Sequence, residues 1–291
     1  MQEMLFSSTS TFVEPFKRQL LKWIGNKQRF AHEIASFFPG DMRCYYEPFL
    51  GSGAVLATLR PSRAVASDVF RPLMEIWKML HEAPEVLKQW YLDRWERYTS
   101  GDKVLEYARV KASYNESPNG ADLLFLCRSC YGGVVRFRKA DGHMSTPCGP
   151  HDPILPIDFG KRVDEWHRRT SGTSFRIADY RETMAEAKEG DLVYCDPPYA
   201  HSQGILYGAQ DFSILDLLAV IIDCKRRGVR VALSIDGKKR SGEHVCELPI
   251  PDGLFEREVF VNCGASMLKR FQMGGRNCDE HHVADRLLLT Y

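Results

Sequence analysis

The feature that most constrains this chain is a repeated pattern in which a short apolar run ends near an acid or a glycine and a helical pattern follows. The first run, CYYEPF (44–49), leads through LGSG into AVLATL, and RAVASD (63–68) precedes PLMEIWKML. Further strand-like runs are SFRIADY (174–180), DLVYCD (191–196), VRVALSID (229–236), FEREVFV (255–261) and DRLLLTY (285–291). This alternation predicts a doubly wound, mainly parallel α/β sheet with helices on both faces.

The alternation lapses between about residues 75 and 170. APEVLKQWYLDRWERY and VLEYARVKASYN predict helices, and VVRFRKADGHMSTP (134–147) predicts a β-hairpin with Asp141-Gly142 at its turn. We therefore expect a sheet domain made of residues 1–74 and 171–291, with an inserted lobe, 75–170, that is mainly helical and carries the hairpin.

Composition excludes several classes of protein. With 291 residues, 44% of them hydrophobic, the chain is long enough for one large core. Its longest aliphatic run, Leu217 to Ile222, is too short to span a bilayer, and MQEMLFSSTSTFVEPF lacks the pattern of a signal peptide. We expect a soluble, cytoplasmic protein without a membrane partner. The 9 scattered cysteines then favour free thiols.

Two glycines stand between a strand and a helix in EPFLGSGAV (47–55). Gly51 and Gly53 would let a ligand approach the backbone closely. A dinucleotide fingerprint would need a third glycine where the chain has Leu56, which argues against a nicotinamide cofactor. Asp68 ends the next strand, where an acid can accept hydrogen bonds from ribose hydroxyls. A plain tight turn and a surface acid are the alternative for this pair.

The stretch YCDPPYA (194–200) places an acid, two prolines and an aromatic ring at the end of an apolar run. Pro197 and Pro198 stiffen the backbone after Asp196 and remove two amide donors. Asp196 can accept a hydrogen bond from an amine, and Tyr199 offers a stacking face. The stretch therefore predicts a site for an amine on a flat ring, whereas an ordinary turn would explain only the prolines.

The order of these segments resembles the Dam-type DNA adenine-N6 methyltransferases, the class in which the glycine motif precedes DPPY and the target-recognition region lies between them. The matching segments are KWIGNK (22–27), PFLGSG (48–53), SD (67–68), IADY (177–180) and VYCDPPY (193–199). The resemblance runs from Leu20 to Tyr291 and includes LCRSCYGGVVRFRKADGHMSTPCG (126–149), which is similar to the family's hairpin pattern.

The resemblance implies a Rossmann-like methyltransferase sheet and S-adenosyl-L-methionine as cofactor, bound across the carboxyl edge of the sheet. Asp68 would contact its ribose. The residues that the resemblance implies for cofactor binding are Trp23, Gly25, Lys27, Phe49, Gly51, Gly53, Asp68, Asp179, Tyr180 and Asp196.

The implied activity is transfer of a methyl group to the exocyclic N6 amine of an adenine flipped out of double-stranded DNA. The implied catalytic residues are Asp196, Pro197, Pro198 and Tyr199. Tyr199 would stack on the flipped base, while Asp196 and the Pro197 carbonyl would accept hydrogen bonds from the amine. Transfer would be direct, without a covalent enzyme intermediate.

The predicted hairpin is basic, which favours DNA binding over a merely solvated hairpin. The stretch 125–150 contains one acid, Asp141, and four basic residues, Arg128, Arg136, Arg138 and Lys139. A basic two-stranded ribbon can enter the major groove, where arginine pairs with guanine. By similarity, Arg136 occupies the position of a guanine-reading arginine and Tyr131 that of an aromatic wedge.

The hairpin also departs from the family pattern. Gly132 stands where many relatives carry Asn, Arg138 stands where Asn is common, and MST replaces the usual FNV. The familiar GATC target is therefore not carried over to this chain.

Other functions fit these motifs less well. An RNA or protein-amide substrate would keep the cofactor, but protein-amide methylases typically carry Asn in place of Asp196, and the basic insertion also argues against them. A nicotinamide-dependent oxidoreductase and a non-catalytic DNA-binding protein fit less well. Double-stranded DNA is the expected partner and no obligate protein partner is inferred; a companion restriction nuclease stays open.

Two weaker signals concern metal binding and a lid. Cys127 and Cys130 form a C-x-x-C pair, and Cys278 lies near His281 and His282, but there is no second C-x-x-C, so we expect no metal. The segment 200–212 is either a lid that closes over the flipped base or a disordered loop.

Overall fold

The computed structural model describes residues 12–138, 140–198, 212–235, 249–262 and 284–291. The described strands are β1 (Tyr45–Glu47), β2 (Ala64–Asp68), β3 (Thr173–Ile177), β4 (Leu192–Cys195), β5 (Arg230–Ile235), β6 (Arg257–Asn262) and β7 (Ala284–Leu289). They form one sheet in the order β3-β2-β1-β4-β5-β7-β6. Neighbours from β3 to β5 pair in parallel, and β7 runs antiparallel to both β5 and β6.

Helices connect these strands and surround them. They are α1 (Ala31–Ser36), α2 (Ala54–Leu59), α3 (Arg71–Glu82), α4 (Pro84–Ser100), α5 (Lys103–Glu116), α6 (Gly120–Ser129), α7 (Pro156–Arg169), α8 (Tyr180–Ala185) and α9 (Ile214–Arg226), with a short 3-10 turn at Tyr131–Gly133. Within the described ranges, no helix combines the length and apolarity of a membrane span.

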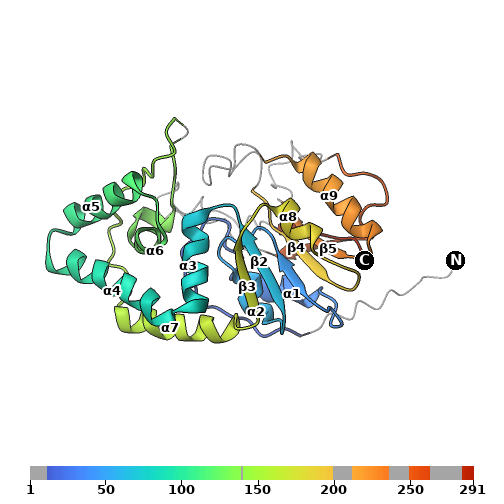
Figure 1. The fold of residues 1–291 in the computed structure, drawn as a ribbon, viewed down its shortest axis with the longest axis horizontal. Helices are drawn as coiled ribbons and strands as arrows, with labels where there is room; N and C mark the ends of the chain where they lie inside the picture. The colour runs from blue at the N-terminus through green and yellow to red at the C-terminus, as the bar shows by residue number, and fades with distance from the viewer. Residues whose placement is uncertain (1–11, 139, 199–211, 236–248, 263–283) are drawn as a thin grey trace, which may run out of the picture.

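The sheet has a hydrophobic core on each face because successive strand residues point to opposite sides. Tyr45 and Tyr194 belong to the core shared with α1, α2 and α3, whereas their neighbours Tyr46 and Val193 belong to the core shared with α8 and α9. Figure 1 shows these helices on the two sides of the sheet. The predicted doubly wound α/β fold is thereby confirmed.

The helices of the predicted insertion pack around α3 rather than standing apart from the sheet. In α3, Trp77 stacks on Phe175 of β3 and also contacts Trp166 of α7. One apolar cluster runs from the sheet through α3 into α4, α5 and α6. The predicted boundary at residue 75 falls inside α3, and the division into two domains stays a prediction.

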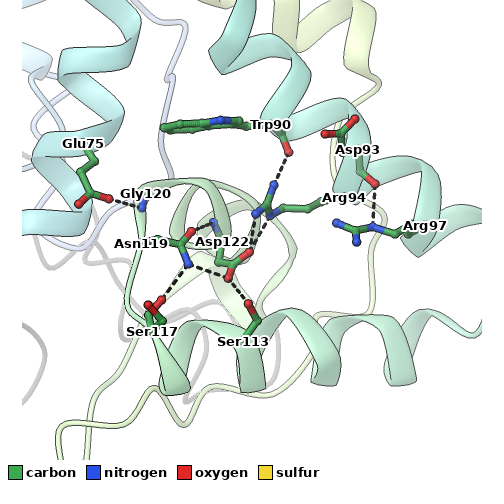
Figure 2. Close-up of polar contacts among 10 residues, drawn as sticks. All are labelled: Glu75, Trp90, Asp93, Arg94, Arg97, Ser113, Ser117, Asn119, Gly120 and Asp122. Atoms are coloured by element: carbon green, nitrogen blue, oxygen red, sulfur yellow. Dashed lines mark hydrogen bonds and ion pairs between the residues drawn. The ribbon is translucent and has the colours of Figure 1, made fainter.

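A buried polar network fixes the start of α6 against α4 and α5 (Figure 2). Arg94 of α4 donates to Asp122 at 2.8 Å, and Ser113 of α5 donates to the same carboxylate at 2.7 Å. Asn119 caps α6 by accepting from the Asp122 N–H at 2.8 Å. Since a buried carboxylate is costly unless it is paired and hydrogen-bonded, the network favours a single arrangement of the three helices.

The predicted hairpin forms, with isolated bridges in place of a continuous ladder. Phe137 faces Met144 in one antiparallel bridge. Nearer the base, Thr146 Oγ1 accepts from the Arg136 N–H at 2.9 Å and donates to the Val134 carbonyl at 2.8 Å, so a side chain replaces ladder hydrogen bonds. The hairpin therefore keeps its shape although the two arms are not fully paired.

Candidate active site

A cavity of about 370 Å³ opens where β1, β2 and β4 end. The loop before α1, the turns after β1 and β2, and the start of α8 supply its walls. The predicted cofactor residues that line it are Trp23, Gly25, Lys27, Phe49, Gly51, Asp68, Asp179, Tyr180 and Asp196. Segments far apart in the sequence thus meet at the carboxyl edge of the sheet, the edge at which open α/β sheets bind ligands.

Gly53 is the predicted cofactor residue that does not line the cavity. Its φ of 62° is left-handed, and a Cβ there would lie 3.2 Å from the Trp77 ring. The structure therefore gives Gly53 a role in turning and packing the chain at the start of α2, and its contact with a cofactor stays a prediction.

Asp68 holds the glycine turn in place from the end of β2. Its Oδ2 accepts from the Gly51 N–H at 3.1 Å and its Oδ1 accepts from the Phe70 N–H at 3.0 Å. Burial raises the pKa of Asp68, and the backbone N–H groups act in the opposite direction. Each oxygen has a second lone pair, so Asp68 can also accept hydrogen bonds from ligand hydroxyls.

An aromatic wall forms the other side of the cavity. Phe49 and Tyr180 are stacked with ring centroids 5.1 Å apart, and Phe212 meets Phe49 edge-on at 5.8 Å. The Tyr180 hydroxyl is buried without a hydrogen-bond partner among the described residues. Asp179 caps α8 by accepting from the Arg181 N–H at 2.8 Å. The wall therefore suits a flat ring with polar atoms at its edge.

The Asp-Pro-Pro segment follows β4 at the floor of the cavity. Pro198 lines the cavity, Pro197 is buried, and Asp196 lies 3.0 Å from the Lys27 Nζ. Burial lowers the pKa of Lys27, but the charges of Asp196 and Asp285 raise it by more than burial lowers it. The net result is a pKa well above the ordinary value. Tyr199 lies outside the described residues, as does the predicted lid up to residue 211.

Glu47 at the end of β1 was not among the predicted site residues. Glu47 lines the cavity, is buried, and accepts from the Tyr45 hydroxyl at 2.7 Å. Burial, together with the nearby charge of Asp196, raises its pKa to about 8. The rule that selected Asp68, an acid at the end of a strand, would have selected Glu47 as well.

Asp285 at the start of β7 was also missed. Its Oδ2 lies 3.1 Å from the Lys27 Nζ, so Lys27 is shared between two carboxylates. The useful signal would have been strand direction, because the first residues of an antiparallel strand lie at the same edge as the ends of its parallel neighbours.

The hairpin has one buried and one exposed face. Its exposed face carries Arg136, Arg138, His143 and Ser145, and its buried face Val135, Phe137, Met144 and Thr146. Arg138 pairs with Asp141 across the turn. Arg136 makes no side-chain hydrogen bond or ion pair that involves another described residue, and Tyr131 is 51% exposed at the base. Lys139 lies outside the described residues.

Arg128 is a correction to the predicted DNA contacts. It is only 5% exposed, and its guanidinium donates to the Leu20 carbonyl at 2.7 Å. It also lies over the Phe159 ring at 5.9 Å. Arg128 therefore fastens the segment before Trp23 to α6, and its guanidinium points to backbone carbonyls of the protein.

Cys127 and Cys130, the predicted C-x-x-C pair, are both buried. Burial raises the pKa of both the Cys127 and the Cys130 thiols. Among the described residues, no group of three or more His, Cys, Asp or Glu side chains has the arrangement of a metal site. Cys278, His281 and His282 lie outside those residues.

The chain is similar in sequence to one family of known proteins. Residues 23–244 match the family model for D12 class N6 adenine-specific DNA methyltransferases. The chain is 26% identical to the DNA N-6-adenine-methyltransferase of Escherichia phage P1 over 232 residues, which is 76% of this chain and 30% of that protein. It is 31% identical to the retron Ec67 DNA adenine methylase of Escherichia coli over 189 residues, 62% of this chain and 63% of that one. The DNA adenine methylase of Vibrio cholerae is 26% identical over 238 residues, which cover 75% and 81% of the two chains. The chain thus spans less than two thirds of the first two relatives.

Proposed function

The chain belongs to the D12 class of N6 adenine-specific DNA methyltransferases, and we propose that it transfers a methyl group to the exocyclic N6 amine of adenine in double-stranded DNA. One observation carries this proposal: a single cavity joins the Asp196-Pro197-Pro198 segment after β4 to the glycine turn after β1. A methyl donor held by the turn and an amine held by Asp196 would meet within that cavity.

We propose S-adenosyl-L-methionine as the donor, which supplies an electrophilic methyl group. The cavity suits it in three respects. The Phe49 and Tyr180 wall fits an adenine ring, and Asp68 fits ribose hydroxyls. Acidic side chains, including Asp68 and Asp196, complement a ligand that carries a sulfonium and an ammonium group.

The residues of this chain would act by position and charge. Asp196 accepts a hydrogen bond from the target amine, as does the Pro197 carbonyl, and the two together orient the nitrogen lone pair. As the amine attacks, it becomes positive, and the Asp196 carboxylate stabilises that charge. Lys27, 3.0 Å away, holds this carboxylate in place. Tyr199 would stack on the flipped adenine.

The hairpin would select the DNA sequence. Its exposed face presents Arg136 to the major groove, where an arginine pairs with guanine in bidentate fashion. Tyr131, exposed at the base of the hairpin, would occupy the space that the flipped adenine leaves in the duplex. Lys139 would contact phosphate. Because Gly132 and Arg138 depart from the family pattern, we expect a target that differs from GATC.

Methyl transfer with labelled cofactor tests the proposed function. The purified chain is incubated with duplex DNA of random sequence, and the nucleosides are separated after digestion. We expect label in N6-methyladenine, lost in Asp196→Ala and retained in Asp223→Ala, which breaks an exposed ion pair with Arg227 just after α9. Label in RNA or in protein amides but not in DNA would reject the proposed substrate.

A further inference from the structure

Asp285 lies at the carboxyl edge of the parallel strands because its own strand, β7, runs antiparallel to them. β7 pairs with β5 so that Arg286 lies opposite Ile235, the last residue of β5. The start of β7 therefore lies at the carboxyl edge of the parallel strands, beside the segment in which Asp196 follows β4. An acid placed first on an antiparallel strand comes to the same edge as an acid placed last on a parallel one.

Lys27 is held between these two acids. Its Nζ lies 3.0 Å from Asp196 Oδ1 and 3.1 Å from Asp285 Oδ2, and the exposed fractions of the side chains are 7% for Lys27, 18% for Asp196 and 9% for Asp285. Three charged groups at this depth stabilise the fold only when they are paired. One ammonium shared by two carboxylates leaves the group with a formal charge of −1.

The sign of that charge suits a reaction in which the acceptor becomes positive. If Lys27 faced Asp196 alone, the pair would be neutral, and little negative potential would remain for an attacking amine. Among the described residues, the other titratable groups that act on the cluster are the Tyr194 phenol and Glu47. Burial raises the pKa of Glu47 to about 8, so this carboxyl is mainly neutral at pH 7. The excess negative charge of the Lys27, Asp196 and Asp285 cluster is then due to Asp285.

We propose that Asp285 is a positioning residue for methyl transfer, an inference that rests on the proposed function. Asp285 draws the Lys27 ammonium partly away from Asp196, so that Lys27 fixes the orientation of Asp196 without cancelling its charge. Asp285 itself touches neither the amine nor the methyl donor; it acts through Lys27.

Charge and shape are separated by two variants. Asp285→Asn keeps the size of the side chain and an acceptor for Lys27 but removes the charge, and Asp285→Glu keeps the charge. In single-turnover methyl transfer we expect Asp285→Asn to be slower by on the order of 10- to 100-fold, with KM for DNA unchanged, and Asp285→Glu to recover most of the rate. Glu258→Gln is the matched control. It breaks the 2.6 Å ion pair between Glu258 on β6 and Arg286 on β7, the strand that carries Asp285, and leaves the ion pairs of Lys27 in place.

The pH profile distinguishes this role from a structural one. Asp285 is one of the carboxylates that raise the pKa of Lys27, so the loss of its charge lowers that pKa. On the alkaline side of the pH profile, the rate of Asp285→Asn should therefore begin to fall at a lower pH than the rate of the parent. A parent-like rate and alkaline limb in Asp285→Asn would overturn the proposal.

A second measurement works without activity. The titration of Lys27 is followed by NMR in protein labelled with ¹³C at lysine Cε, with a Lys27→Arg spectrum to assign the signal. Asp285→Asn should move the titration to lower pH, and an unchanged titration would overturn the assigned role. If the parent chain methylates no DNA, the proposed function fails, and this titration still decides whether Asp285 sets the charge state of Lys27.

Discussion

Phe70 packs edge-on against Phe137, with ring centroids 5.5 Å apart and an interplanar angle of 71°. Phe70 lines the cavity beside Trp23, whereas Phe137 lies on the buried face of the hairpin. The wall of the proposed cofactor site and the proposed recognition element therefore share one aromatic contact. A ligand that orders either side restricts the other, which is the physical basis of coupling between two sites.

We predict that cofactor and DNA strengthen each other's binding through this contact. The coupling should amount to about 1–3 kcal/mol and must be equal in both directions. Phe70→Leu and Phe137→Leu should each reduce it, and the double variant should be no worse than either single one. Calorimetric titration of the cofactor analogue S-adenosylhomocysteine, with and without DNA, measures the coupling. Additive losses in the double variant would show that the contact does not transmit it.

Asp68→Ala should weaken cofactor binding by about 1–3 kcal/mol, the usual loss when a charged hydrogen-bond acceptor is removed. The Gly51 and Phe70 N–H groups lose their acceptor at the same time, so the glycine turn should loosen. Asp68→Asn keeps one acceptor oxygen and should lose less. Calorimetry with S-adenosylhomocysteine measures both losses, and an unchanged affinity in Asp68→Ala would shift the ribose contact to another acid such as Asp179.

Ionisation of the buried Glu47 carboxyl should lower the free energy of unfolding as pH rises. Its pKa is raised from 4.5 to about 8 in the folded chain, so the folded state binds more protons than the unfolded state between these values. Stability therefore falls through that window, by on the order of 2–5 kcal/mol. In Glu47→Gln this contribution to the pH dependence should be absent. Urea unfolding at pH 5 and pH 8 compares the two chains, and parallel pH dependences would contradict the assignment.

Most of the site residues that the sequence could predict lie at the ends of strands. Asp68, Asp179 and Asp196 all follow apolar runs, and parallel strands bring their carboxyl ends to one edge whatever their distance in sequence. The same rule could not find Asp285, because it needs the direction of β7, and no local pattern distinguishes an antiparallel last strand from a parallel one.

Arg128 and Gly53 show where tertiary packing overrides a residue's usual environment. A charged side chain normally indicates the surface, yet Arg128 is buried because backbone carbonyls of an earlier segment accept hydrogen bonds from its guanidinium N–H groups. A glycine after a strand indicates close approach of a ligand, yet Gly53 is required by the Trp77 ring. Neither partner lies near these residues in sequence, so the composition of the hairpin or of the glycine motif could not reveal them.

Removal of the Arg128 guanidinium should affect folding and not DNA charge contacts. Arg128→Met leaves the Leu20 carbonyl without its donor and should cost about 1–3 kcal/mol in the free energy of unfolding. The dependence of DNA affinity on salt should stay unchanged, because a buried arginine neutralises no phosphate. Urea unfolding and binding at several salt concentrations test this. A smaller salt slope at unchanged stability would restore Arg128 to the DNA interface.

Arg136 and Arg138 occupy the same exposed face of the hairpin but should differ in effect. Arg136 makes no side-chain hydrogen bond or ion pair with another described residue, whereas Arg138 is already paired with Asp141. A free guanidinium can pair with guanine, so Arg136→Ala should cost about 1–3 kcal/mol and relax the choice at one base pair. Arg138→Ala should weaken binding less and equally for all sequences, because Asp141 already offsets much of its charge. Methylation of a randomised-site library by each variant separates the two outcomes. An unaltered site preference in Arg136→Ala would mean that the hairpin grips phosphates and that the bases are read elsewhere in residues 75–170.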